Sequence, residues 1–288
     1  MQNLKIALCQ MNVVDDKEKN IEKAINMIKE SKKEDADIAI LPEMFNCPYE
    51  NDKFVEYGEC LEDSYTLKSI AKIAKEENIY VLIGSIPEKE IITNKNKLEK
   101  TENIYNTSFL VDNNGKILGY HRKMHLFDID VKDKIYFKES DTLTQGNELT
   151  VIDTKSKIGK IGIAICYDIR FPEVSRLMAL KGAKILIFPG AFNLVTGPAH
   201  WELLFRTRAL DNQVFTIGVS PALDREANYN AYGHSLIVNP WGEIVVECGY
   251  DEELIVAEID LDEIATVREE LPLLKNRRID LYSLKYKK

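Results

Sequence analysis

The chain of 288 residues is poor in cysteine. It has five, Cys9, Cys47, Cys60, Cys166 and Cys248. They are odd in number, lie far apart and include no C-x-x-C pair, which excludes a disulfide framework and a cysteine zinc site as the basis of the fold. In a reducing cytoplasm each of these thiols is available as a free thiol.

The chain also lacks long apolar runs and an excess of positive charge. No stretch approaches the length of a transmembrane helix. The N-terminal stretch MQNLKIALCQMNVVDD has too short an apolar segment, and no cleavage-site pattern, for a secretory signal. Lys and Arg number 38 against 47 Asp and Glu, a net charge of −9, which argues against nucleic acid or an anionic membrane as the main partner. We therefore expect a cytoplasmic protein that acts on a small molecule.

Motifs of several enzyme classes are absent as well. There is no G-x-S-x-G elbow of a serine hydrolase and no phosphate-binding loop. His121 and His125 have i, i+4 spacing but lack the intervening glutamate of a metalloprotease. Neither they nor His200 and His234 lie in a local cysteine-protease signature, although a Cys-His pair stays open.

What the chain does contain is an order of elements that occurs twice. The first half predicts strands over 4–11, 38–45 and 79–85, helices over 17–33 and around 65–77, a surface loop over 88–103 and a hairpin over 106–121. The second half predicts strands over 160–168, 184–192 and 214–220, helices over 172–182 and 199–212, and a hairpin over 234–247. Local matches support the repeat: ILPEMF corresponds to IFPGAF, and FLVDNNGKIL to LIVNPWGEIV.

The repeat predicts two pseudo-symmetric halves. Strands of continuous Ile, Val and Leu fit sheets that are buried on both faces. We expect the two sheets to pack face to face with helices outside, as a four-layer α-β-β-α sandwich. A single doubly wound sheet is the alternative that the repeat alone leaves open.

Candidate catalytic residues stand where the two halves differ. Cys9 and Cys166 occupy similar places, but Cys166 is followed by Tyr-Asp-Ile-Arg, and Glu43 stands where the other half has Gly190. Taken singly, Glu43, Lys123 and Cys166 are an ordinary capping carboxylate, surface lysine and buried thiol. All three fall at ends of predicted strands, where α/β active sites gather. Together they supply the nucleophile, the base and the cation that thiol catalysis needs.

Three sequence blocks point to a known family. LPEMF, YHRKMHLFD and CYDIRFPE, in that order and spacing, resemble the signature blocks of the nitrilase (carbon–nitrogen hydrolase) superfamily, and the resemblance covers nearly the whole chain. The family's Glu-Lys-Cys triad corresponds to Glu43, Lys123 and Cys166, and its second glutamate to Glu139. The resemblance implies the α-β-β-α sandwich and a homodimer or larger homo-oligomer. We expect one domain over 1–288, with a tail from about 270 to 288 at a subunit interface.

Further stretches resemble the ω-amidase branch, which hydrolyses the terminal amide of 2-oxoglutaramate and 2-oxosuccinamate. They are LPEMFNCPYE (41–50), HLFDIDV (125–131), PGAFNLVTGPAHWELL (189–204) and HSLIVNPWGE (234–243). The chain departs from the branch at Asp133-Lys134, where a Gly-Lys turn is usual, and in the longer loop over 88–103. The alternatives are another substrate (a nitrile, a carbamoyl-amine or deaminated glutathione) and a nitrilase-like protein that only binds partners.

The resemblance assigns roles to the four residues. Glu43 is the general base for Cys166, which forms a thioester with the substrate. Lys123 and the backbone N–H of Tyr167 stabilise the oxyanion, and Glu139 orients Lys123. This cycle requires no metal ion and no other cofactor.

Four more residues are predicted to bind the substrate. They are Arg170, Thr196, Tyr49 and Phe192. A guanidinium at position 170 could bind the distal carboxylate of a dicarboxylate monoamide as a bidentate pair. The two hydroxyl groups would add polar contacts, and the phenyl ring would pack against the carbon chain. The alternative for Arg170 is an ion pair with Asp168 or Glu173 that only braces the loop.

Overall fold

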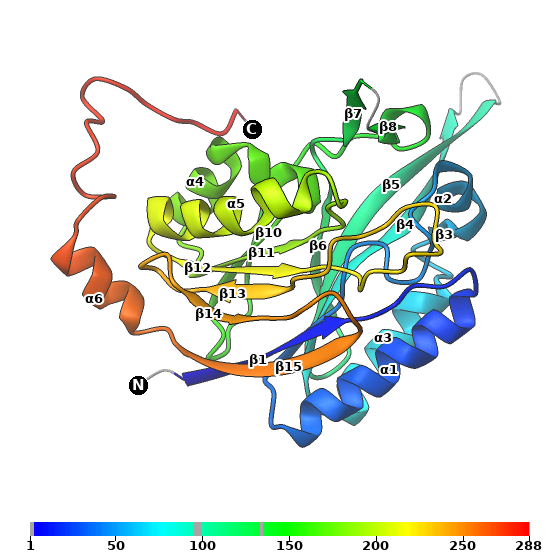
Figure 1. Cartoon of the computed structure of the whole chain (residues 1–288), viewed down its shortest axis with the longest axis horizontal. Helices are drawn as coiled ribbons and strands as arrows, with labels where there is room; N and C mark the ends of the chain where they lie inside the picture. The colour runs from blue at the N-terminus through cyan, green and yellow to red at the C-terminus, as the bar shows by residue number, and fades with distance from the viewer. Residues whose placement is uncertain (1–2, 95–98, 133–134, 288) are drawn as a thin grey trace.

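The computed structural model describes residues 3–94, 99–132 and 135–287. Two β-sheets stack face to face, and helices cover both outer faces (Figure 1). One outer layer consists of α1 (Lys17–Lys33) and α3 (Tyr65–Glu76), and the other of α4 (Pro172–Leu180) and α5 (Gly197–Asn212). The predicted α-β-β-α sandwich is confirmed, and the alternative of one doubly wound sheet is wrong.

The first sheet has the strand order β15-β1-β2-β4-β5-β6, with β3 paired to β4. Its strands are β1 (Asn3–Gln10), β2 (Ile38–Ile40), β3 (Glu59–Cys60), β4 (Tyr80–Asn94), β5 (Glu99–Val111), β6 (Ile117–Arg122) and β15 (Glu253–Asp260). The central strands β1, β2 and β4 are parallel, whereas β5, β6 and β15 pair antiparallel to their neighbours. A parallel centre places the carboxyl ends of β1, β2 and β4 at one edge of the sheet.

The second sheet repeats this pattern. Its order is β14-β13-β12-β11-β10-β9. Its strands are β9 (Thr150–Asp153), β10 (Lys160–Ile163), β11 (Ile185–Pro189), β12 (Phe215–Val219), β13 (Leu236–Val238) and β14 (Ile244–Glu247). β10, β11 and β12 are parallel, and β13 and β14 follow antiparallel, as β5 and β6 do in the first sheet. The two halves of the chain therefore share one topology.

Each half also contributes one strand to the other half's sheet. β9 follows the last strand of the first half but pairs antiparallel with β10. β15 follows the last strand of the second half and pairs antiparallel with β1. This exchange ties the two sheets together through the backbone.

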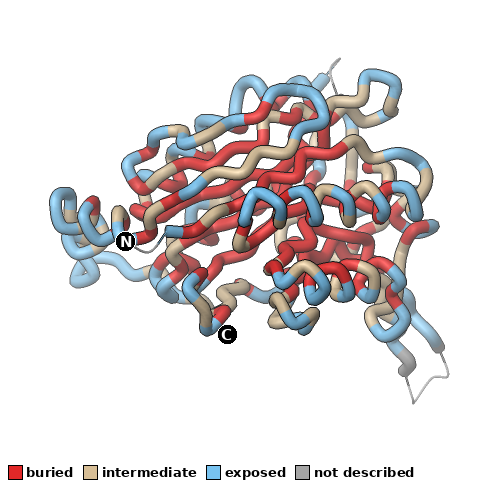
Figure 2. Tube along the Cα trace, turned by 90° about the horizontal axis from the view of Figure 1, so that it is seen from below, coloured by how far each residue is buried: buried red, intermediate tan, exposed pale blue. Residues whose placement is uncertain are grey.

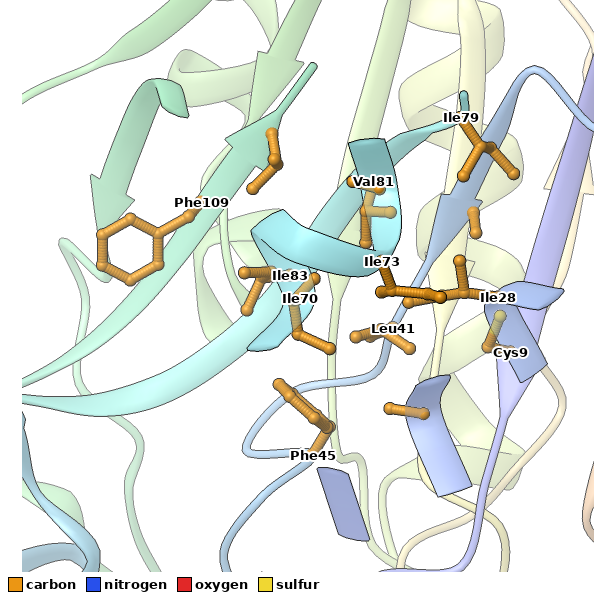
Figure 3. Close-up of a cluster of buried hydrophobic side chains, with 14 of the residues drawn as sticks. Cys9, Ile28, Leu41, Phe45, Ile70, Ile73, Ile79, Val81, Ile83 and Phe109 are labelled. Atoms are coloured by element: carbon orange, nitrogen blue, oxygen red, sulfur yellow. The ribbon is translucent and has the colours of Figure 1, made fainter. Parts of the chain in front are cut away.

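The core lies in three apolar layers. Between the sheets, isoleucines of both halves meet, among them Ile6, Ile38, Ile163 and Ile187, each no more than 1% exposed. Outside the first sheet, side chains of β1, β4, α1 and α3 converge, including Cys9, Ile28 and Ile70 (Figure 3). A corresponding layer under α4 and α5 contains Phe188 and Trp201. The central strands of both sheets are accordingly buried along most of their length, while the outer faces of the helices are exposed (Figure 2).

All four predicted helices are present, but α4 ends at Leu180 instead of 182 and α5 begins at Gly197 instead of 199. The side chain of Asp16 caps α1 by accepting a hydrogen bond from the Lys19 N–H at 3.1 Å, and Lys32 and Lys33 lie in the last turn, where a cation is favourable. Ser64 caps α3 in the same way, through Leu67 N–H. The structure adds α2 (Asn51–Tyr57), α6 (Glu263–Glu270) and a small sheet of β7 (Asp128–Val131) and β8 (Ile135–Lys138), which the pattern did not predict.

The predicted surface loop over 88–103 is wrong. β4 and β5 form one long hairpin, whose register runs from Val81 opposite Val111 to Asn94 opposite Glu99. The outer part of the hairpin projects beyond the helices (Figure 1), so Ile91 and Ile92 are exposed and neither face of the strands must be apolar. Residues 95–98, and the Asp133-Lys134 departure, lie outside the described residues.

Candidate active site

Glu43 lies in a turn just beyond β2. The strand ends at Ile40 and is therefore shorter than the prediction over 38–45. Met44 N–H donates to Ser85 Oγ at 2.9 Å, so the turn is held against β4. β4 shifts its register between Ile83 and Ile86 at this place. A Cβ atom at Gly84 would lie 1.9 Å from the Leu41 carbonyl oxygen, which explains the glycine. The irregular backbone of β4 thus positions the turn that carries Glu43.

Lys123 directly follows β6. Its backbone N–H donates to the Asn106 carbonyl at 2.9 Å, and its own carbonyl accepts from Gly146 N–H at 2.8 Å. The preceding residue, Arg122, forms ion pairs with Glu88 and Glu90. These bonds fix the backbone on both sides of the lysine, which is 1% exposed.

Cys166 lies just beyond β10, as the first residue of a 3-10 turn over 166–170, and not on the strand as the prediction over 160–168 had it. Its φ angle is +45°, in the left-handed region that costs a non-glycine residue free energy and that clusters at functional sites. Across from it, a Cβ atom at Gly190 would lie 3.2 Å from the Cys166 Cα. Gly190 therefore leaves the space that the cysteine occupies.

The two predicted glutamates, Glu43 and Glu139, both contact the ammonium group of Lys123. Lys123 Nζ lies 2.9 Å from Glu43 Oε1 and 2.8 Å from Glu139 Oε1. Glu43 Oε2 accepts from the Ala191 N–H at 2.7 Å, next to Gly190 in the other half of the chain. The structure thus brings Glu43 next to Gly190, the residue that stands at the corresponding place in the second half. Every side chain in this cluster is buried.

Further polar groups complete the cluster. The hydroxyl of Tyr49, predicted to contact substrate, lies 2.5 Å from Glu139 and 3.2 Å from Glu43. Asn106 donates to Glu43 Oε1 at 2.8 Å, and Tyr229 donates to the Ala191 carbonyl at 2.6 Å. Sequence reasoning missed both Asn106 and Tyr229. Neither the stretch NTSFLV, whose first three residues are all polar, nor the loop around Tyr229 carries a local signal that marks these two residues.

The charges of the cluster set its protonation. Burial, followed by repulsion from Glu43, raises the pKa of Cys166 well above its ordinary value, with Lys123 opposing. Burial disfavours the ammonium of Lys123, but attraction to Glu139 and Glu43 outweighs it and keeps the pKa of Lys123 well above its ordinary value. Burial also raises the pKa of Glu139. A raised pKa favours the neutral thiol of Cys166, which would need a base to react as a nucleophile.

The two histidines of the YHRKMHLFD block bond Asp168. His121 Nε2 lies 3.1 Å and His125 Nδ1 lies 2.7 Å from the carboxylate oxygens of Asp168. The Cys-His pair that the sequence left open is therefore not what these two rings form.

Arg170 faces aromatic rings. Its guanidinium lies 4.6 Å from the centroid of Phe192 and 5.5 Å from that of Tyr167, and Nη1 lies 3.1 Å from His200 Nδ1. Burial lowers the pKa of Arg170. Within residues 3–94, 99–132 and 135–287 no carboxylate forms an ion pair with it, so the alternative pairing with Asp168 or Glu173 is not formed. Thr196, by contrast, directs its hydroxyl to Asn193 Oδ1 at 3.3 Å.

A small cavity of about 50 Å³ borders the cluster at Glu43, Tyr49 and Tyr229. This volume accommodates water rather than a substrate of dicarboxylate size. The part of the chain that the structure describes contains no group of three His, Cys, Asp or Glu side chains placed to hold a metal ion.

Comparison with known proteins gives matches along nearly the whole chain. Residues 5–269 match the carbon-nitrogen hydrolase family model. The chain is 46% identical to "Omega-amidase NIT2" of Xenopus tropicalis, over 100% of both chains. It is 45% identical to "Omega-amidase NIT3" of Saccharomyces cerevisiae, over 98% of this chain and 96% of the relative.

Solved structures agree. The crystal structure of Saccharomyces cerevisiae Nit3, described as a member of branch 10 of the nitrilase superfamily, superposes with a TM-score of 0.84 at 42% identity, over 96% of this chain and 97% of that one. The C. elegans NitFhit protein superposes with a TM-score of 0.85 at 33% identity, over 98% of this chain and 66% of that one.

Proposed function

The chain belongs to the carbon–nitrogen hydrolase family, and from this premise we propose that it is an ω-amidase. Its reaction is the hydrolysis of the terminal amide of small dicarboxylate monoamides, such as 2-oxoglutaramate and 2-oxosuccinamate, to the 2-oxo diacid and ammonia. The observation that carries the proposal is the buried Glu43–Lys123–Glu139 cluster beside a neutral Cys166 thiol. The full-length similarity to ω-amidases supports the substrate class.

In the first half-reaction, Glu43 takes the proton of Cys166 while Sγ attacks the amide carbon. The oxyanion that forms is stabilised by the Lys123 ammonium and the backbone N–H of Tyr167. Removing one such donor typically costs about 10²–10³-fold in rate. The C–N bond then breaks, Glu43 gives its proton to the leaving nitrogen, and ammonia departs from a thioester.

In the second half-reaction, Glu43 acts as base again. It takes a proton from a water molecule, whose oxygen attacks the thioester carbon; the C–S bond then breaks and Glu43 gives this proton to Sγ, which restores the thiol and the base and releases the acid. The small cavity beside Glu43 and Tyr229 offers room for that water. Glu139 keeps Lys123 in place through its 2.8 Å contact and does not touch the reacting atoms.

The substrate is bound at its distal carboxylate by Arg170, whose guanidinium lacks a carboxylate partner among the described residues. Phe192 and Tyr167 flank this guanidinium and shape the path of the short carbon chain. Tyr49 contributes through the carboxylate cluster, and Thr196 stabilises the loop before α5 through Asn193.

The finer properties of the protein are proposed in the same way. No helix in the described ranges is long and apolar enough to cross a membrane. We place the enzyme in the cytoplasm, as a homodimer or larger homo-oligomer made of one domain per chain, with no cofactor. Activity that survives treatment with a chelator would support the last point, and loss of activity that zinc restores would contradict it.

The test of the function is ammonia release from a panel of ω-amides, nitriles, carbamoyl-amines and deaminated glutathione. We expect 2-oxoglutaramate and 2-oxosuccinamate to give the highest kcat/KM. Cys166→Ala should abolish turnover, whereas Cys9→Ala, in the matching strand of the other half, should retain it. Near-native turnover by the Cys166 variant would show the mechanism to be wrong, and preference for a nitrile would reassign the substrate.

A further inference from the structure

Asp168 lies two residues after the nucleophile, and its side chain is completely buried. Its Oδ1 accepts from the backbone N–H of His125 at 2.9 Å and from the ring Nδ1 of His125 at 2.7 Å. Its Oδ2 accepts from the Ile165 N–H at 3.1 Å and from His121 Nε2 at 3.1 Å. All four bonds of this carboxylate therefore go to residues beside Cys166 or beside Lys123.

These partners come from two segments that are far apart in the sequence. Ile165 directly precedes Cys166, and its bond to Asp168 closes the turn that holds the cysteine at positive φ. His121 and His125 flank Lys123 by two residues on each side. One carboxylate thus links the backbone of the nucleophile to the backbone of the oxyanion-binding lysine.

The carboxylate is suited to hold this geometry. Burial alone would raise the pKa of Asp168, but its bonds to His121 and His125 outweigh burial and hold the pKa well below its ordinary value. An ionised carboxylate can only accept, so the ring nitrogens that face it must carry hydrogen. His121 Nδ1 lies 3.1 Å from Thr150 Oγ1, and the ring of His125 stacks on Phe171 at 3.7 Å, which fixes both rings.

We propose that Asp168 is a positioning residue of the reaction, which sets the placement of Cys166 relative to Lys123 through Ile165 on one side and His121 and His125 on the other. It touches neither substrate nor the reacting atoms. The inference rests on the proposed roles of Cys166 and Lys123. A shift of about 1 Å between such groups can cost about 10²-fold in rate.

The first variant is Asp168→Asn, which keeps the size of the side chain but turns one acceptor into a donor that faces N–H groups. We expect kcat to fall about 100-fold while KM for 2-oxoglutaramate stays within about threefold, because the substrate's distal carboxylate is bound elsewhere. The control is Asp37→Asn. Asp37 also bridges two segments, through Lys5 N–H at 2.9 Å and Lys157 at 2.7 Å, but it precedes β2 at the opposite end from Glu43.

A second set of variants tests the inference without changing the carboxylate. The amide nitrogen of asparagine can take the place of imidazole Nδ1, and that of glutamine the place of Nε2. His121 bonds Asp168 through Nε2 and His125 through Nδ1. We therefore expect His121→Gln and His125→Asn to retain kcat within about threefold, and His121→Asn and His125→Gln to lose about tenfold or more.

This crossed pattern separates positioning from packing. A role in packing alone would rank Asn and Gln in the same order at both positions, and that result would overturn the inference. So would a kcat of Asp168→Asn within threefold of the native value. If Asp168→Asn fails to fold, the histidine variants still decide the matter. Cys166→Ala is assayed in parallel: turnover by that variant would contradict the proposed function instead.

Discussion

One ammonium stands between two buried carboxylates at the centre of the site. Lys123 carries one positive charge, and the carboxyl groups of Glu43 and Glu139 both lie within 3 Å of it. The lysine cannot balance a further negative charge, such as a thiolate, beside both of them. Together with burial, which is the larger cause, the repulsion from Glu43 raises the pKa of the Cys166 thiol. A thiolate–imidazolium pair would behave differently, because it holds a charged nucleophile at rest. The arrangement therefore supports the proposal of general-base catalysis by a carboxylate.

The first residue-scale prediction concerns Glu43→Gln. Amide hydrolysis should be lost because neither half-reaction has a base. Alkylation of Cys166 by iodoacetamide near neutral pH should become faster, because the variant removes a carboxylate that raises the pKa of the thiol and leaves Lys123 to stabilise the thiolate. The measurement is the alkylation rate against pH, followed by mass spectrometry of the labelled residue.

Glu139→Gln is the control for that experiment. It also removes a nearby negative charge but keeps the base, so its loss of amidase activity should be the smaller of the two. Slower alkylation of Glu43→Gln at every pH would mean that Glu43 already holds the thiol proton in the resting enzyme, contrary to the expectation.

The second prediction concerns Arg170. Arg170→Lys and Arg170→Met should raise KM strongly for 2-oxoglutaramate and much less for an uncharged short amide, because a planar guanidinium binds a carboxylate through two bonds. Steady-state kinetics on the two substrates provide the measurement. Equal losses on both, or only a lower melting temperature, would assign Arg170 to bracing the loop and leave the substrate class open.

At the scale of elements, the sequence predicts burial better than it predicts hydrogen bonding. Apolar residues continue past the last ladder pair of β2 and β10, since Leu41 and Ile165 are fully buried but lie beyond the ends of these strands. The predicted strands over 38–45 and 160–168 were therefore too long. The outer arms of the β4–β5 hairpin show the converse error: they pair regularly, but their exposed positions mix Ile91 and Ile92 with polar residues over 100–102.

The same limit applies to the site. Glu43, Lys123 and Cys166 could be proposed from the sequence because each stands in a block that resembles a known pattern, and Glu139 because it lies beyond the lysine as the family's second glutamate does. Asn106 reaches Glu43 across 63 residues of sequence, and nothing local marks that contact. Contacts of this kind follow from the packing of the two halves, which the repeat indicates only in outline.

The register shift in β4 yields a prediction at this scale. Gly84→Ala should lower activity and stability together, because the new Cβ would lie 1.9 Å from the Leu41 carbonyl and 2.4 Å from that of Pro42 and would displace the turn that carries Glu43. Thermal unfolding and kcat are measured on the same sample. Gly249→Ala is the matched control, since a Cβ there meets nothing within 4 Å. Native activity of Gly84→Ala would show that the turn tolerates displacement.

At the scale of the whole molecule, the second half exposes several large apolar side chains close together, as interaction surfaces do. Leu203 on α5 is 63% exposed, and Leu210 and Trp241 lie in the same shallow groove. The C-terminal tail exposes Ile279 and Leu281 at 72% and 70%, although its end is fixed where Tyr286 accepts from Leu149 N–H.

The last prediction follows from these two apolar surfaces, which we propose are covered by a second copy of the chain. Leu203→Glu should dissociate the assembly, because a carboxylate would have to be buried at the interface without a partner. Light scattering should then give a mass near 33.0 kDa, against twice that value or more for the native protein. Tyr65→Glu is the control, since Tyr65 is an exposed ring on α3, on the opposite outer layer. A native protein that scatters as a monomer would contradict the proposal. Because Glu43, Lys123, Glu139 and Cys166 all belong to one chain, the dissociated variant should still hydrolyse amides.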